Sequence, residues 1–259
     1  LKDIPAVEIV TIMSMLALVA NYTVLKSNKV PVWGKHHGLL AVRGITSTLG
    51  VILYFFTIQH IPLPSALILR YTAPIFTALI GVFMLNELIR VQQWLFFGLS
   101  FLGVILVHGF KVDEASWYIL SGLGSAFFKG LSNSIVRKLE HEEHPQVITF
   151  YGYMASIPLA GIYLVSDYVV LEGQDWLLIA CVSVLGYLGH YNTVRAVQFG
   201  PIVPVSAIAY LSIVYALIFN YFLLHETLSW TKLLGIGFVL LGVLLNVFYK
   251  HTKTTNKEN

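Results

Sequence analysis

Nine long apolar runs constrain the fold of this chain more than any other feature of its sequence. A helix needs about 20 apolar residues to cross the hydrocarbon core of a bilayer. Short polar connections such as KSNKVPVWGKHH and RKLEHEEHP separate the runs. We therefore predict an all-α, polytopic helical membrane protein with nine transmembrane helices, at residues 5–25, 38–58, 64–85, 92–109, 117–136, 147–165, 176–197, 203–224 and 232–249.

The composition requires lipid as part of the solvent. Of the 259 residues, 57% are hydrophobic and 11% are charged, and the mean hydropathy is +0.76. A soluble domain carries about 25% charged residues. The net charge is only +3, and no basic stretch is dense enough to bind nucleic acid. The single cysteine, Cys181, excludes a disulfide within the chain and a cluster of thiolate metal ligands.

Lysine and arginine residues gather on one side of the predicted helices. If the first connection faces the cytoplasm, that side carries eleven of them and the opposite side carries three. Because positive charge favours the cytoplasmic side, we predict a cytoplasmic C-terminus. The compact connections fit a bacterial inner (plasma) membrane. The eleven are Lys26, Lys29, Lys35, Arg43, Arg90, Arg137, Lys138, Arg195, Lys250, Lys253 and Lys257, and the three are Lys2, Lys111 and Lys232.

The second half of the sequence repeats the first. The segment FMLNELIRVQQWLFFGLSFLGVILV from Phe83 aligns with FLLHETLSWTKLLGIGFVLLGVLLN from Phe222, at an offset of 139 residues. So many matches at one register indicate duplication. The matched pairs include Gly50 with Gly189, Gln59 with Gln198, Pro62 with Pro201, Tyr71 with Tyr210, Glu87 with Glu226, Gly98 with Gly237 and Gly103 with Gly242.

The helix count predicts how the two halves are oriented. Five predicted helices separate equivalent points, so the halves should lie upside down relative to each other in the membrane. The helix predicted at 117–136 has no counterpart ahead of residue 5. We therefore expect the natural protein to carry a tenth helix before the first one seen here.

Three stretches carry a resemblance to a known family. The first is YTAPIFTALIGVFML, which is followed by Asn86-Glu87 and by a Gly-rich helix ending in GVILV. The second is the repeat copy of this region, LLHETLSWTKLLGIGFVLLGVLLN. The third is LLAVRGITSTLGVILYFFTIQHIPLPSALIL. The pattern resembles the EamA-type branch of the drug/metabolite transporter superfamily. The resemblance implies ten helices in two inverted five-helix halves, a central cavity between the halves, and alternating access.

The resemblance also divides the chain. Residues 1–110 are similar to a first repeat that lacks its first helix, residues 115–250 are similar to a second repeat, and residues 251–259 form a polar cytoplasmic tail. One departure concerns Pro74, whose counterpart in the second copy is Ile213. Only the first copy therefore carries a signal for a kinked helix at this position.

Two cations fall within the predicted hydrocarbon zone, where charges usually face a cavity or a partner. Arg70 lies in the helix at 64–85, and Lys129 lies in the helix at 117–136. No acidic residue occupies a comparable depth in the nine predicted helices, so a solute carboxylate or phosphate would neutralise these cations. Lys129 shares a polar stripe that suits either a wet cavity wall or close helix packing, formed by Gly122, Ser125, Ser132 and Asn133.

Three further residues are candidates for the wall of a solute pocket. Tyr71 and Tyr210 occupy equivalent positions in the repeat, and His190 lies in the apolar helix at 176–197. A tyrosine also suits a membrane interface, and a histidine also serves as a proton acceptor or a packed core residue. The predicted solute-binding set is Arg70, Tyr71, Ser125, Lys129, Asn133, His190 and Tyr210.

The motifs of common enzymes are absent from the sequence: it has no HExxH, GxSxG, P-loop or CxxC. We predict no cofactor and no metal, and expect the run from His141 to His144 to be a solvated loop. Glu87 and Glu226 are expected to be structural, because a helix C-terminus disfavours a carboxylate.

The leading hypothesis is a secondary transporter of small organic metabolites that carry a carboxylate, such as amino acids or organic acids. A flippase for lipids or lipid-linked sugars is the alternative, and an intramembrane enzyme is a remote one. The expected partners are an anionic or zwitterionic solute and membrane lipids, with a homodimer left open.

Overall fold

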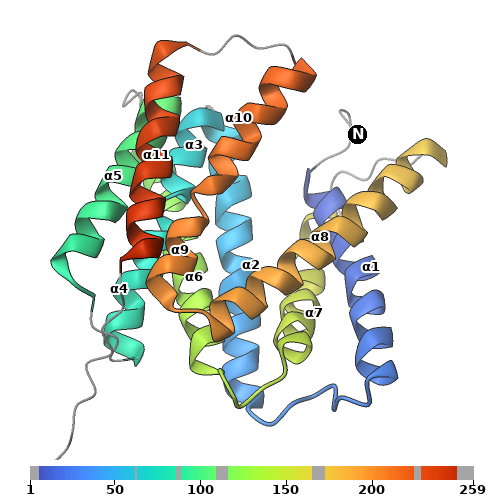
Figure 1. The fold of residues 1–259 in the computed structure, drawn as a ribbon. Helices are drawn as coiled ribbons and strands as arrows, with labels where there is room; N and C mark the ends of the chain where they lie inside the picture. Colours follow the sequence, from blue (N-terminus) through green and yellow to red (C-terminus); the bar gives the residue numbers. More distant parts are fainter. Residues whose placement is uncertain are drawn as a thin grey trace, which may run out of the picture.

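A computed structural model describes residues 6–61, 63–85, 89–108, 116–164, 173–224 and 229–249. Within these residues the secondary structure is entirely helical (Figure 1). The helices are α1 (Ala6–Ser27), α2 (His37–His60), α3 (Leu63–Arg70), α4 (Ala73–Leu85), α5 (Val91–His108), α6 (Ser116–Lys138), α7 (Pro145–Leu164), α8 (Gly173–Phe199), α9 (Ile202–Ile208), α10 (Leu211–Leu224) and α11 (Trp230–Phe248).

The helix boundaries reproduce the 139-residue offset of the sequence repeat. Adding 139 to the first residue of α1 gives Pro145, where α7 begins, and the same shift carries the end of α2 to Phe199, where α8 ends. The pairs α3 with α9, α4 with α10 and α5 with α11 follow to within one residue at each boundary. Among the described helices, α6 is left without a counterpart, as the sequence predicted.

Two of the nine predicted helices are interrupted, at equivalent positions. The run at 64–85 divides into α3 and α4 around Tyr71, and the run at 203–224 divides into α9 and α10 around Tyr210. Pro74 lies in the first turn of α4, where a missing N–H is tolerated. The second copy has Ile213 there and is interrupted as well, through i to i−3 bonds such as Tyr210 N to Ala207 O. The sequence signal for an interruption in one copy only was therefore incomplete.

Close packing of α5 against α11 joins the two halves (Figure 1). A Cβ added to Gly103 would lie 2.6 Å from Gly235 O and 2.7 Å from Val239 N. A Cβ on Gly242 would lie 2.7 Å from Phe96 O and would also overlap the hydroxyl of Ser100. The two sets of contacts are related by the 139-residue shift, and both require glycine because backbone atoms cannot rotate away.

The apolar character of the helices fits a membrane. Four described stretches are each long and apolar enough to cross a bilayer, namely His37–His60, Ser65–Leu85, Asp175–Phe199 and Trp230–Phe248. Large apolar side chains are exposed along α8, including Leu177 at 70% and Leu185 at 69%. Exposure of this kind on a long apolar helix indicates contact with lipid.

A buried carboxylate joins the connection between α6 and α7 to the connection between α1 and α2, and Gln198 of α8 binds the same region. Glu143 is 7% exposed, and its Oε1 accepts hydrogen bonds from Lys35 N at 2.5 Å and His36 N at 2.6 Å. Those two N–H groups immediately precede α2, so Glu143 fixes the backbone at the entry to that helix from a distant part of the chain. Gln198 Nε2 donates to the Leu139 and Glu143 carbonyls at 3.0 and 2.7 Å. The expectation of a fully solvated loop at 141–144 was therefore wrong for Glu143.

Candidate functional site

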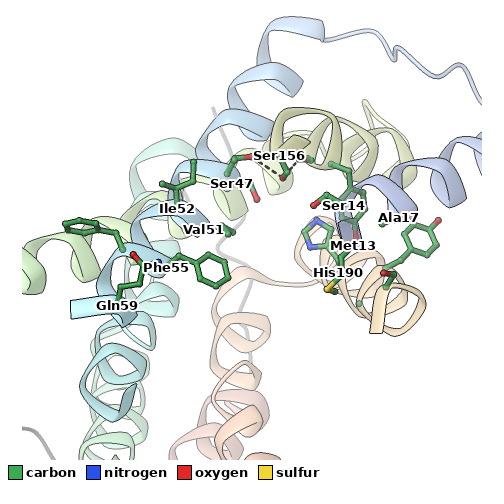
Figure 2. Close-up of a pocket in the computed structure, with 17 residues that line it drawn as sticks. Met13, Ser14, Ala17, Ser47, Val51, Ile52, Phe55, Gln59, Ser156 and His190 are labelled. Atoms are coloured by element: carbon green, nitrogen blue, oxygen red, sulfur yellow. Dashed lines mark hydrogen bonds between the residues drawn. The ribbon is translucent and has the colours of Figure 1, made fainter. Parts of the chain in front are cut away.

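A cavity of about 260 Å³ lies between α1, α2, α7 and α8 (Figure 2). Its wall therefore comes from two helices of the first repeat and from their two counterparts in the second. The lining residues are Met13, Ser14, Ala17, Ser47, Thr48, Val51, Ile52, Phe55, Phe56, Gln59, Gly152, Tyr153, Ser156, Ser183, Gly186, Tyr187 and His190.

The cavity lies where the two repeats meet. Six pairs of its lining residues are related by the 139-residue offset, so equivalent positions of the two repeats line the same cavity. The pairs are Met13 with Gly152, Ser14 with Tyr153, Ala17 with Ser156, Ser47 with Gly186, Thr48 with Tyr187, and Val51 with His190.

The wall of the cavity combines apolar side chains with neutral polar groups. On one side, Figure 2 shows Val51, Ile52 and Phe55 from α2, and on the other it shows His190 from α8. No Asp, Glu, Lys or Arg is among the lining residues. A small cavity of this composition suits a small solute with an apolar body and a few groups that need hydrogen bonds.

Hydroxyl groups link α2 to α7 beside the cavity. The Thr48 and Ser156 hydroxyls lie 3.2 Å apart, and each is also within hydrogen-bond distance of a carbonyl of its own helix, Gly44 O and Gly152 O. Because each hydroxyl has one proton, one donates to the other while the second donates to its own helix. The Tyr153 ring contacts the His190 ring, with their centroids 5.4 Å apart. These contacts hold the polar wall in place without a formal charge on its surface.

A buried arginine lies behind that wall. Arg43 is 2% exposed, and its Nη1 donates to Ile148 O at 3.0 Å. Its Nη2 lies 3.2 Å from His190 Nε2, while its Nε has no hydrogen-bond partner among the described residues. A Cβ on Gly152 would overlap the Arg43 guanidinium, so the absence of a side chain at Gly152 makes room for the charge.

The burial of Arg43 was not predicted. Arg43 was counted with the cytoplasmic charges, but it lies more than one turn inside α2 and within the bundle. A charge near a predicted helix end can snorkel outward or turn inward, and the sequence does not decide between the two. The sequence did contain a partial signal for this burial, because the helix predicted at 38–58 already includes Arg43.

Of the seven predicted site residues, His190 lines the cavity. Arg70 instead lies over the Tyr54 ring, 4.3 Å from its centroid, with Nη1 3.5 Å from Ser125 Oγ. Ser125 is fully buried and donates to Gly50 O at 2.7 Å. Arg70 and Ser125 therefore belong to the contact between α2, α3 and α6.

The predicted polar stripe on α6 packs against three neighbouring helices. Asn133 Nδ2 lies 3.4 Å from Thr77 Oγ1 on α4, and Ser132 Oγ lies 3.4 Å from Arg43 O on α2. A Cβ on Gly122 would contact Leu69 on α3. These contacts are those of close helix packing, the alternative that the stripe left open. The role of Lys129 in solute binding stays a prediction.

Lys129 is half-buried beside the other buried cations. Its charge lies within electrostatic range of both Arg70 and Arg43. Within the described part of the chain, no carboxylate forms an ion pair with any of these three residues. The bundle therefore holds three basic side chains that form no ion pair with a described carboxylate.

Tyr71 and Tyr210 meet where the two interrupted helices face each other. Their ring centroids lie 6.3 Å apart, and the Tyr71 hydroxyl lies 3.3 Å from Ser212 Oγ. Tyr210 is fully buried, and its hydroxyl has no hydrogen-bond partner among the described residues. Neither tyrosine lines the cavity. Glu87 and Glu226, predicted to be structural, lie outside the described residues.

Comparison with known proteins relates the chain to transporters. A model of the EamA-like transporter family matches residues 1–109 and 116–248. The chain is 31% identical over 215 residues to the pseudopaline exporter CntI of Pseudomonas aeruginosa (strain UCBPP-PA14), which covers 82% of this chain and 75% of that protein. It is 23% identical over 225 residues to an S-adenosylmethionine uptake transporter of Rickettsia prowazekii, which covers 84% and 74%.

A solved crystal structure also matches the fold. Its TM-score is 0.82 at 15% sequence identity, and the match covers 96% of this chain and 91% of that one. At this identity the likeness shows a shared arrangement of helices.

Proposed function

Because the chain belongs to the EamA-like transporter family, we propose that it is a secondary transporter that moves a small organic solute by alternating access. The observation that carries this proposal is the cavity whose wall contains six repeat-related residue pairs. Sites between structural repeats, near the middle of the membrane, are typical of secondary transporters.

We propose further that the two halves form an inverted repeat. The helix boundaries follow the 139-residue offset, and the α5–α11 contact repeats under the same shift, which supports equivalent halves. If the halves exchange conformations during transport, a cavity on their axis keeps its lining while its opening changes side. The cavity between α1, α2, α7 and α8 meets this requirement.

The solute in this proposal bears a carboxylate and is anionic or zwitterionic, as an amino acid or an organic acid is. The support comes from Arg43, Arg70 and Lys129, which lie within the bundle without an ion pair to any described carboxylate. A buried cation without a partner is costly, so a bound anion stabilises this region. The relatives named as exporters or uptake transporters of organic compounds support a small organic solute.

We place the protein in a bacterial inner membrane with its C-terminus in the cytoplasm. Removing Arg43 from the charge count leaves ten positive residues on the cytoplasmic side against three on the other. The bias therefore persists after the correction. Two C-terminal reporters test the orientation, one active only in the cytoplasm and one active only outside it. Activity of the first supports the proposal, and activity of the second alone contradicts it.

The transport proposal is tested with purified protein in proteoliposomes. We expect uptake of at least one carboxylate-bearing solute from a panel of amino acids, dicarboxylates and organic amines, above the level in protein-free vesicles. Uptake of amines alone would contradict the carboxylate assignment. Movement of labelled lipid between leaflets, without uptake of any solute, would support the flippase alternative instead.

A further inference from the structure

We infer that His190 and Arg43 together form a carboxylate-binding subsite at the polar wall of the cavity. His190 contacts the carboxylate directly. Arg43 lies behind His190, away from the cavity, and supplies the positive charge. This inference rests on the proposed transport function, because it assigns the solute's orientation within the same cavity.

The hydrogen bond between the two residues sets the state of the imidazole ring. Arginine is always protonated in proteins and has no acceptor. The Nε2 atom of His190, 3.2 Å from Arg43 Nη2, must therefore accept. The ring is then neutral with its proton on Nδ1. His190 lines the cavity, and Nδ1 has no partner among the described residues, so its N–H is available to a ligand.

The backbone around Arg43 is built to keep the charge in this place. Ile148 O accepts from Nη1, and Gly152 leaves the guanidinium the space that a Cβ would occupy. The Nε group remains without a described partner although the side chain is buried. A solute anion on His190 would compensate this charge at short range, in an environment where electrostatic interactions are strong.

The subsite breaks the symmetry of the cavity that contains it. The repeat counterpart of His190 is Val51, and the counterpart of Arg43 is Val182. The two positions equivalent to Arg43 and His190 are therefore both apolar, and only one of the two equivalent sides of the cavity carries a charged and polar pair. The solute should place its carboxylate at His190, beside the Tyr153 ring, and its apolar part against Ile52 and Phe55 across the cavity (Figure 2).

The donor set favours a carboxylate over a phosphate group. Phosphate sites commonly bring several cations or a helix N-terminus into direct contact with the ligand. No Lys or Arg is among the described residues that line this cavity, and its donors are one ring N–H, the Gln59 amide and a few hydroxyl groups. A carboxylate has two oxygens, and His190 with one hydroxyl can satisfy them.

Cysteine modification tests the inference without a known solute. The chain has one cysteine, Cys181, which is exposed on α8. In a Cys181→Ser background, Val51→Cys places a thiol on the cavity wall across from His190 (Figure 2). The measured quantity is the modification rate with an anionic sulfonatoethyl methanethiosulfonate, divided by the rate with its cationic trimethylammonium analogue. The ratio cancels differences in thiol reactivity.

Arg43→Gln should lower this ratio on the order of a hundredfold. Arg43 and Val51 are eight residues apart on α2, which is about 12 Å along the helix. Losing one charge at this distance changes the rate with each reagent about tenfold, in opposite directions, at an effective dielectric constant of about 20. Arg195→Gln removes an exposed charge from α8 and should leave the ratio unchanged. If Arg43→Gln does not fold, the ratio for the thiol introduced by Val51→Cys is compared with the ratio for 2-mercaptoethanol in solution, and the ratio should be higher for the introduced thiol. A ratio that is equal for these two thiols, or unaffected by Arg43→Gln in folded protein, overturns the inference.

Protection by small ligands tests the carboxylate itself. N-acetyl-L-leucine should slow modification of the thiol introduced by Val51→Cys several-fold more than N-acetyl-L-leucinamide or phenyl phosphate at the same concentration. His190→Phe should abolish that difference, whereas His190→Asn keeps an N–H donor and should retain part of it. Equal protection by the acid and the amide, or greater protection by the phosphate, contradicts the assignment.

These tests separate the subsite from the transport proposal. Solute uptake in proteoliposomes together with a flat reagent ratio would reject the subsite and leave the transporter in place. A high ratio without uptake of any solute would leave an anion site and reject transport.

Discussion

Replacing Gly103 by alanine should destabilise the protein through the contact between α5 and α11. The new Cβ would lie 2.6 Å from Gly235 O and 2.7 Å from Val239 N. Both atoms belong to backbone, so the two helices must move apart. Overpacking of this kind costs about 1–3 kcal/mol. Alanine also favours a helix over glycine by about 0.5–1 kcal/mol, and this gain offsets part of the cost.

Gly98 is the matched control, because it lies on the same helix and a Cβ there meets no atom within 4 Å. Gly98→Ala should be neutral or slightly stabilising, and Gly103→Ala should lower the melting temperature in detergent. With about 2–4 °C per kcal/mol for a chain of this size, the difference between the variants should be several degrees. Gly242→Ala should behave like Gly103→Ala, with Gly237→Ala as its control.

The double variant Gly103→Ala with Gly242→Ala should cost less than the sum of the two single changes. Both glycines lie at the same crossing, so the separation forced by one Cβ makes room for the other. Equal melting temperatures for Gly98→Ala and Gly103→Ala would refute the reasoning, since the two positions differ mainly in the distance to the opposite backbone.

Three further predictions follow from single side chains. Glu143→Gln should destabilise the protein by about 1 kcal/mol or more in chemical unfolding, because it removes a charged acceptor from Lys35 N and His36 N. The control is Glu142→Gln, which breaks an exposed pair with His36 and should change stability by less than about 0.5 kcal/mol. Tyr210→Phe should leave thermal stability unchanged or raise it slightly, since the buried hydroxyl has no described partner; a clear loss would show that this hydroxyl is hydrogen-bonded. Lys129→Met should weaken competition by carboxylates far more than it lowers expression, and an unchanged apparent affinity would show that this lysine is structural.

The sequence predicted the helical class, the repeat register and most helix boundaries, because these depend on properties that a single chain displays directly. Apolar runs set the helices, and the 139-residue offset that aligns Gly103 with Gly242 also aligns α5 with α11. The interruption near Tyr210 was not predicted, because no proline occupies the position of Ile213. The opposite orientation of the halves stays a proposal.

The cavity could not be located from the sequence in the same way. In a membrane helix, lipid-facing and core-facing residues are both apolar, so periodicity does not reveal which face meets a cavity. The α6 stripe around Ser125 therefore suited packing and solute contact equally, and the structure uses it for packing. The pairing of Arg43 with His190 joins residues 147 apart, and only their positions in space reveal it.

The central claim, that solute passes through the cavity between α1, α2, α7 and α8, is tested most directly by blocking that cavity. Uptake of a carboxylate-bearing solute is measured in proteoliposomes before and after full modification of Val51→Cys, in the Cys181→Ser background, by sulfonatoethyl methanethiosulfonate. The control is Glu142→Cys in the same background, which places a thiol at an exposed position of the connection between α6 and α7. We predict that modification of the Val51→Cys variant abolishes uptake and that modification of the Glu142→Cys variant does not. Undiminished uptake by the fully modified Val51→Cys variant would contradict it.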